Sequence, residues 1–305
     1  MRAKPTSLIL TLIVVVSVTS CSFNNQFYHP KPLKAPIKTS ITHDYTGDTL
    51  YAMHIVSHKQ PPVFINPKGD TVDFDYRIEN ILFSNRQEDT LHGWFISPTD
   101  SVPPKATLLF LHGNGGNILS YLSLVFPFVK MGYQAFIFDY SGYGFSSGKP
   151  NRANVLSDAN AAVELISQRN DVKGTMLLLY GQSLGGHLAP TVANMNSKAI
   201  DGVILEGAFS SHKDIAAHSA GFVGQLMVKE AYPAKVAVKD MHKPILIIHS
   251  INDNVIPVSM GRKLFENANE PKDYFEIDEC HICGPLYYAD EIDKRILALM
   301  KPKSE

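Results

Sequence analysis

The sequence predicts an α/β fold, in which a mostly parallel sheet is covered by helices on both faces. From about residue 76, short apolar runs alternate with segments of helical periodicity, which is the order expected of such a fold. Most of these runs are continuous, as in strands that are buried on both faces. A chain of 305 residues, 45% of them hydrophobic, is also long enough to bury one sizeable core.

The expected elements begin with two runs, "IENILFS" at 78–84 and "TLHGWFIS" at 90–97, which we expect to pair antiparallel at one edge of the sheet. The helical segments place their apolar residues on one face, and those that follow a strand begin directly after it. Buried strands are expected at 105–113, 133–140, 175–183, 201–208, 243–250 and 272–278, and helices at about 117–130, 154–168, 184–195, 256–268 and 286–300.

The turn after the strand at 175–183 carries a candidate nucleophile, Ser183, in the motif G-x-S-x-G at 181–185. Chemistry in open parallel sheets takes place at the carboxyl ends of the strands, which is where this turn lies. A sharp strand-to-helix turn with small flanking residues lifts a serine hydroxyl above the sheet. The helix that follows favours negative charge developing at its N-terminus.

Four motifs, "LFLHGNGGN", "FDYSGYGFSSG", "GQSLGGHLA" and "HSINDNVIP", resemble the α/β-hydrolase superfamily, and within it the small-capped abhydrolase serine hydrolases. That group includes protein depalmitoylases and lipid esterases. The resemblance runs from about residue 76 to 300 and implies an α/β-hydrolase fold with a short cap insert at about 208–238. One departure is Ser141, where these relatives more often carry arginine. This chain therefore lacks the structural or substrate-binding role that the arginine has in them.

A serine hydroxyl needs a base to take its proton, and in this fold the triad follows the order serine, acid, histidine. Asp253 and Glu206 both follow downstream strands, and Asp253 matches the family position; Glu206 is expected to brace the loop after its own strand. Of the 12 histidines, only His281 lies after Asp253, and it follows the last strand. Ser183, Asp253 and His281 are therefore the expected catalytic residues.

The oxyanion of a tetrahedral intermediate needs preset hydrogen-bond donors. One is expected from the backbone N–H of Leu184, the residue after the nucleophile. The resemblance selects the N–H of Asn114 as the second donor, with Gly115 as the alternative. The expected reaction is a two-step acyl transfer, in which the carboxylate orients the imidazole and stabilises its charged form.

The cap insert contains apolar residues that line an acyl pocket in one interpretation and only pack the insert onto the core in the other. These candidates for the pocket are Phe209, Phe222, Val223, Leu226 and Met227. A small apolar cap suits a short or medium acyl chain, or a lipid reached from a membrane surface. The substrate is thus expected to be a small-molecule or lipid ester or thioester.

His281 is flanked by Cys280 and Cys283, so a metal site has to be weighed. Zinc takes four ligands, or three and a water, and this tight run has no second cluster elsewhere. We expect no metal and no cofactor. The two cysteines are a structural disulfide, two free thiols or a regulatory redox pair, and the sequence leaves these alternatives open.

The N-terminus predicts export. Arg2 and Lys4 precede an apolar stretch, Leu8 to Val18, that is too short to span a bilayer, which needs ~20 apolar residues. The junction Val18-Thr19-Ser20-Cys21 resembles a bacterial lipobox, which implies a signal peptide at 1–20 and lipidation of Cys21; an ordinary signal peptide is the alternative. By analogy, Ser22 favours the outer membrane over the inner one. A lipidated N-terminus, tether and lead-in are expected at 21–75, and the hydrolase domain at 76–303.

The net charge is −1. The sequence has no basic run that would bind nucleic acid and no acidic tail that would bind a cationic partner. The partners expected are the ester substrate and, through a lipid anchor, a membrane of the bacterial envelope; the oligomeric state is open. Two other functions remain alternatives: a serine peptidase or amidase on the same fold, and a non-catalytic binding protein.

Overall fold

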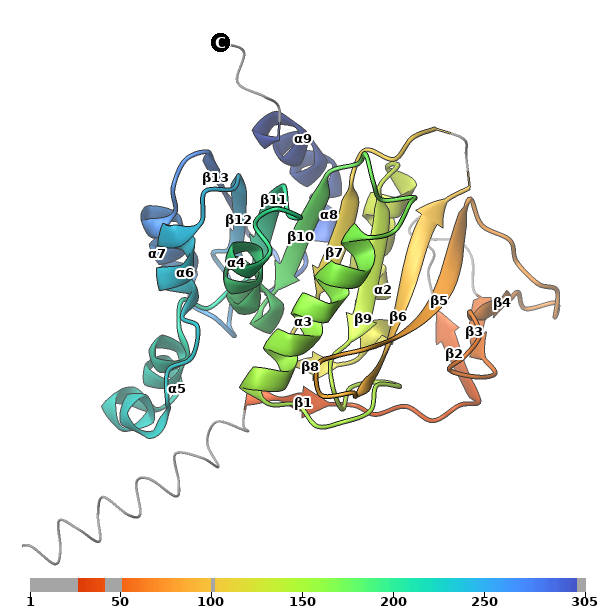
Figure 1. The fold of residues 1–305 in the computed structure, drawn as a ribbon, viewed down its shortest axis with the longest axis horizontal. Coiled ribbons are helices and arrows are strands. Elements are labelled where there is room, and N and C mark those ends of the chain that lie inside the picture. The colour runs from red at the N-terminus through yellow and green to blue at the C-terminus, as the bar shows by residue number, and fades with distance from the viewer. Residues whose placement is uncertain (1–26, 42–50, 100–101, 301–305) are drawn as a thin grey trace, which may run out of the picture.

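The structure, a computed structural model, describes residues 27–41, 51–99 and 102–300. Its centre is an eight-stranded sheet with the order β13-β12-β11-β10-β7-β9-β6-β5 (Figure 1). The strands are β5 (Tyr76–Ser84), β6 (Thr90–Pro98), β7 (Thr107–Leu111), β9 (Gln134–Asp139), β10 (Leu177–Gln182), β11 (Gly202–Glu206), β12 (Ile245–Ser250) and β13 (Lys272–Ile277). Strands β5 and β6 form the expected antiparallel edge, and the strands from β9 to β13 run parallel.

Helices cover both faces of this sheet, as the continuous apolar runs predict. Along β7, Leu109 and Leu111 pack into one core, whereas Leu108 and Phe110 pack into the other. The α/β fold expected from the sequence is therefore confirmed. The first core lies under α3 (Arg152–Ser167), α4 (Leu184–Met195), α6 (Ala234–Asp240) and α7 (Val258–Asn267), and the second under α2 (Ile118–Lys130) and α9 (Ala289–Leu299).

Ser141, the departure noted in the second motif, is buried at the loop after β9. Its N–H donates to Asp158 Oδ2 (2.7 Å), and its hydroxyl donates to Asp158 Oδ1 (3.0 Å). The Asn85 amide donates to the same carboxylate (2.6 Å). A small hydroxyl residue thus links this loop to α3 and to the turn between β5 and β6.

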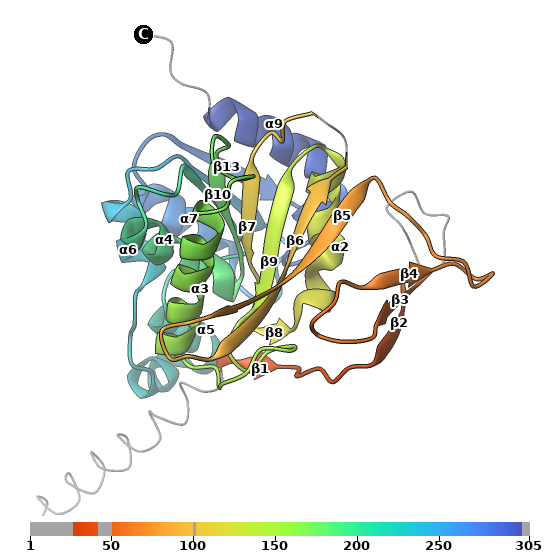
Figure 2. The same ribbon diagram turned by 45° about the vertical axis from the view of Figure 1, so that its right-hand side comes forward.

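The described part of the segment expected as tether and lead-in at 21–75 contains several strands. Among the described residues, β1 (His29–Pro30) pairs with β8 (Gly115–Gly116), and β2 (Ile37–Ile41), β3 (Tyr51–Ile55) and β4 (Val63–Ile65) form a small antiparallel sheet. Figure 2 shows this sheet beside the β5 edge. Backbone N–H groups of residues 29–33 find partners in distant loops, and composition does not reveal such pairing. The part of the chain described here contains no helix that is long and apolar enough to cross a membrane.

Candidate active site

The turn between β10 and α4 holds Ser183 in a conformation that few side chains adopt. Its φ is +53° and its ψ is −110°, and such angles persist only where the surroundings enforce them. Here the Ser183 N–H donates to the Glu206 carbonyl (2.8 Å), and the Ser183 carbonyl accepts from His187 N–H (3.0 Å). A Cβ on Gly185 would overlap the carbonyl of Leu111, so only glycine lets α4 approach β7 this closely. This is the strained elbow that the motif predicts.

Asp253 and His281 are joined directly. His281 Nδ1 donates to Asp253 Oδ2 (2.5 Å), and Asp253 Oδ1 accepts from the N–H groups of Val255 and Ile256 (both 2.8 Å). Burial raises the pKa of Asp253, but its hydrogen bonds with His249 and His281 and the Ile256 amide lower it by more, so that the net pKa lies well below its usual range. The carboxylate is thus ionised at neutral pH and fixes the ring nitrogen that it contacts.

Ser183 and His281 each lie against the turn formed by Glu206 and Gly207, and no hydrogen bond joins the two side chains in the described structure. The Glu206 carbonyl holds the Ser183 amide, and a Cβ on Gly207 would lie 2.9 Å from His281 Nδ1. His281 Nε2, the nitrogen not used by Asp253, is buried and has no hydrogen-bond partner among the described residues. The serine and imidazole therefore approach the same turn, with one ring nitrogen left to accept a proton; in free enzymes such contacts often tighten only when substrate binds.

The loop after β7 is held by hydrogen bonds at four successive carbonyls. Those of His112, Gly113 and Gly115 accept from Tyr140 OH (3.1 Å), the His112 ring (2.8 Å) and Tyr121 OH (3.0 Å). The N–H and C=O of a trans peptide point in opposite directions. Anchoring the Gly113 carbonyl therefore fixes the direction of the Asn114 N–H. Leu184 is the first residue of α4, where the helix offers its N–H no partner.

The fourth carbonyl, that of Asn114, accepts from Tyr143 OH (2.8 Å) and from the N–H of His29 (2.8 Å). His29 belongs to a segment that we call the N-terminal strap, residues 27–33. The strap continues with hydrogen bonds from Lys31 N–H to Gly116 (3.1 Å) and from Leu33 N–H to Gly144 (2.7 Å). The strap therefore positions the loop that carries both candidate donors, Asn114 and Gly115, and sequence patterns gave no sign of it.

Glu206 is fully buried and braces the histidine loop as well as its own. One carboxylate oxygen accepts from the Gly284 N–H (2.7 Å), and the other accepts from Tyr180 OH (3.0 Å) and the Gln182 amide (2.8 Å). Burial raises the pKa of Glu206, and these three hydrogen bonds oppose the rise. Gly284 begins the short helix α8 (Gly284–Tyr287), directly after the loop with His281. Glu206 thus fixes the loop without touching the His281 ring nitrogens.

His249 is a second histidine at Asp253 that strand periodicity did not reveal. Its Nε2 lies 2.9 Å from the Ile256 carbonyl and 3.4 Å from Asp253 Oδ2, and its side chain is buried.

Cys280 and Cys283, on either side of His281, form a disulfide with a Cα–Cα distance of 5.3 Å. Within the described ranges, no group of three or more histidine, cysteine or acidic side chains is arranged to hold a metal ion. Cys21 lies outside the described residues.

The expected acyl pocket is not formed as proposed. Helix α5 (His212–Met227) has non-helical angles at Ala220 and Gly221, and its outer part turns away from the body. Phe222 and Leu226 are consequently 72% and 59% exposed, and Met227 is half-buried. Phe209 alone is buried, stacked on the His187 ring at 4.1 Å between centroids. The rest of the insert, helix α6, packs against the core at Ala234 and Val238.

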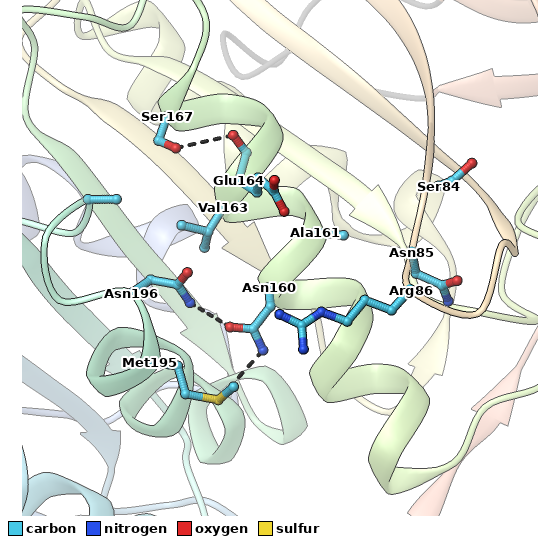
Figure 3. A pocket seen from close by; sticks show the side chains of 11 residues that line it. Ser84, Asn85, Arg86, Asn160, Ala161, Val163, Glu164, Ser167, Met195 and Asn196 are labelled. Carbon is cyan, nitrogen blue, oxygen red and sulfur yellow. Dashed lines mark hydrogen bonds between the residues drawn. The ribbon is translucent and has the colours of Figure 1, made fainter.

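A cavity of about 430 Å³ lies elsewhere, between α3, the end of α4 and the turn after β5 (Figure 3). Asn160 and Asn196 are hydrogen-bonded across it (2.5 Å). Its lining includes none of Ser183, Asp253 and His281, so this cavity is separate from the candidate active site.

Comparisons with known proteins support the α/β-hydrolase fold. Residues 102–238 match the family described as serine aminopeptidase, S33. The chain is 34% identical to the uncharacterized protein YfhR of Escherichia coli over 199 residues, 64% of this chain and 69% of that protein. It is 28% identical over 207 residues to the alpha/beta hydrolase domain-containing protein WAV2 of Arabidopsis thaliana, covering 62% and 66%. An esterase structure from Pyrococcus furiosus superposes with a TM-score of 0.61 at 16% identity, covering 74% and 90%, which supports the fold alone.

If Glu206 braces the histidine loop, Glu206→Ala should lower the free energy of unfolding by at least about 2 kcal/mol, because three buried donors lose their acceptor at about 1–3 kcal/mol each. Glu206→Gln should cost less, since Gln182 Oε1 has no partner in the described structure and a flipped Gln182 amide can accept from the new one. Urea unfolding measures both. The control is Glu276→Ala, which breaks an exposed pair with Arg262 that contributes little to stability because solvent screens it. Equal losses for Glu206→Ala and the control would contradict the brace.

Proposed function

The chain belongs to the α/β-hydrolase superfamily, and from this premise we propose that it is a serine hydrolase that cleaves a carboxylic ester or thioester through an acyl-enzyme on Ser183. The observation that carries the proposal is the hydrogen bond between Asp253 and His281 next to a strained serine elbow. A carboxylate, an oriented imidazole and a serine hydroxyl at a helix N-terminus are the parts that acyl transfer requires.

In the proposed reaction, His281 Nε2 takes the Ser183 hydroxyl proton as the oxygen attacks the substrate carbonyl. Asp253 holds the proton on Nδ1 and stabilises the positive imidazolium. The oxyanion accepts from the N–H groups of Leu184 and Asn114. Collapse of the intermediate transfers the Nε2 proton to the leaving group, and His281 then activates a water that releases the acid. Each backbone donor is worth about 10²–10³ in turnover in enzymes of this type.

A serine aminopeptidase is the second candidate, and the description of the matching family favours it. An aminopeptidase needs an acidic group free to bind the substrate ammonium. Two carboxylates already have partners: the buried Glu206 accepts three hydrogen bonds, and the partly buried Glu230 accepts from the backbone N–H groups of His212 and Lys213. This supports an ester or thioester over a free amino terminus.

The proposed membrane partner and envelope location rest on the sequence. The short apolar stretch and the lipobox-like junction at Cys21 support a lipid anchor. A multiply acylated cysteine would be a firm anchor, since lipid chains contribute roughly 0.8 kcal/mol per buried methylene. We propose that the enzyme is held at the bacterial envelope by this anchor, on the outer membrane in preference to the inner one.

A fluorophosphonate probe should label the wild-type protein, and Ser183→Ala should abolish the labelling, because the probe reacts only with an activated serine. Ser219→Ala, which removes an exposed hydroxyl on α5, should label normally. Labelling is read by gel fluorescence, and turnover is read with p-nitrophenyl esters from acetyl to palmitoyl beside amino-acid p-nitroanilides. Labelling that survives Ser183→Ala would end the proposal, and turnover of anilides without esters would favour the aminopeptidase.

Replacing the acid should separate Asp253 from Glu206. Asp253→Asn should reduce ester turnover by ~10⁴, because the neutral amide favours the wrong imidazole tautomer. Glu206→Gln should stay within about tenfold of wild type, because it keeps the volume and most hydrogen bonds of the brace. The two variants control for each other under one assay. If Glu206→Gln abolishes turnover and Asp253→Asn does not, the acid has been assigned to the wrong residue.

The strap should act through one backbone hydrogen. His29→Pro removes the N–H that donates to Asn114, and we expect ester turnover to fall by about tenfold or more, as small displacements of catalytic donors do. His29→Ala keeps that N–H and loses only an exposed side chain, so turnover should be unchanged. Both are compared at equal folded fraction, checked by circular dichroism. Equal turnover in the two variants would remove the strap from the catalytic machinery.

A further inference from the structure

Helix α5 is a short helical hairpin whose shape is set by two glycines. Gly221, at φ +60°, turns the chain between an inner part that begins at His212 and an outer part that ends at Met227. A Cβ on Gly224 would lie 2.8 Å from the Cβ of Ala220 and would overlap the Ala216 carbonyl. The outer part therefore packs tightly on the inner part through Gly224. Residues two positions from Gly224 point to the opposite side of the helix, toward solvent.

Those outward positions carry large apolar side chains. Phe222, Val223 and Leu226, which we call the apolar tip, are 72%, 63% and 59% exposed. Between residues 215 and 228 the sequence has no lysine, arginine, aspartate or glutamate, whereas Lys213 and Lys229 on either side are exposed. Three adjacent exposed apolar side chains without a nearby charge are unusual on a freely soluble surface and mark an interaction site.

The apolar tip lies at the end of the molecule where the described chain begins. Phe27 packs against Phe209 (6.4 Å between ring centroids) and against His212, the first residue of α5 (5.0 Å). Figures 1 and 2 both show α5 projecting beyond the sheet at the end where β1 and β8 lie. That end is also the carboxyl edge of the strands, which carries Ser183 and His281.

We propose that the apolar tip docks on a lipid bilayer, with Phe222 and Leu226 inserted among the acyl chains and Lys213 and Lys229 near the headgroups. The proposal rests on the anchor proposed above at Cys21. Five residues lie between Cys21 and Phe27, and the six steps of an extended chain reach at most roughly 20 Å. An anchored Cys21 therefore holds α5 close to the bilayer.

A lipid surface fits the tip better than a second copy of the chain does. The tip is convex and narrow, so a protein partner would need a matching apolar groove, whereas a fluid interface adapts to a projecting helix. The exposed lysines on both sides suit the anionic headgroups of bacterial lipids. Docking in this orientation turns the carboxyl edge toward the bilayer, and the substrate class that this favours is a lipid or an acylated group at the membrane surface.

The test places a fluorescent reporter on the tip of the full chain. The single native tryptophan, Trp94, is fully buried, so its emission is a constant background. In Phe222→Trp, emission should shift to the blue on vesicles of phosphatidylethanolamine and phosphatidylglycerol, and should be quenched when their acyl chains are brominated. Val56→Trp, at a position 65% exposed in the loop after β3, is the matched control and should show neither change. Both variants carry the same anchor, so any difference belongs to the tip.

Further measurements keep the outcome decisive. Flotation of the protein with vesicles but no quenching at position 222 would overturn docking while leaving the anchor intact; no flotation would overturn both. A blue shift without vesicles that grows with protein concentration would assign the tip to a second copy. Repeating the measurement with Ser183→Ala separates docking from the proposed chemistry, since quenching needs no turnover.

The double variant Phe222→Ser with Leu226→Ser should lower turnover of a vesicle-borne ester by about tenfold and leave turnover of a soluble ester unchanged. The control double variant, Val56→Ser with Met195→Ser, should change neither rate.

Discussion

The close approach of α4 to β7 is the constraint on which the rest of the site depends. Gly185 lets the helix backbone contact the Leu111 carbonyl, and this contact forces Ser183 into its positive φ. Once the turn is fixed, the Ser183 amide meets the Glu206 carbonyl, and the Leu184 amide is left free at the start of the helix. Backbone contacts thus hold Ser183 in place. Strain of this kind is tolerated because the parallel strands β7, β10 and β11 hold it from three sides.

Two buried carboxylates lie near one histidine, and their surroundings give them different roles. Asp253 faces the imidazole and two amides, and the pKa of this carboxyl is depressed. Glu206 faces a phenol, a side-chain amide and a backbone amide, and burial raises the pKa of that carboxyl. Both follow strands of the sheet, so strand order alone allows either to be the acid. The structure distinguishes the two roles by where each carboxylate points, since only Asp253 is hydrogen-bonded to a ring nitrogen of His281.

The sequence predicts the strands and helices of the sheet because their periodicity is local, and it predicts Ser183 and His281 because each follows a strand in a fixed order. Asp253 is preferred to Glu206 only through the family resemblance. It does not reveal what depends on contacts between distant segments. The pairing of His29 with the loop at Asn114, the contact of His249 with Asp253 and the link from Glu206 to Gly284 leave no periodic pattern. The role of the apolar residues in the insert stayed open for a related reason: apolar composition does not tell whether Phe222 points inward. In the structure Phe222 is exposed and follows a left-handed glycine at 221.

The N-terminal strap also constrains the order in which the molecule is completed. It is the first described segment to be synthesised, yet its partners lie about 85 residues further along, at Asn114 to Gly116, and beyond them at Gly144. Closing so long a loop has an entropic cost, and few contacts form until β7 and β9 are in place. The strap must therefore remain unpaired while most of the sheet assembles. Completion of the loop beside Ser183 is then a late folding event, so a partly folded chain would hold an elbow without a finished oxyanion loop.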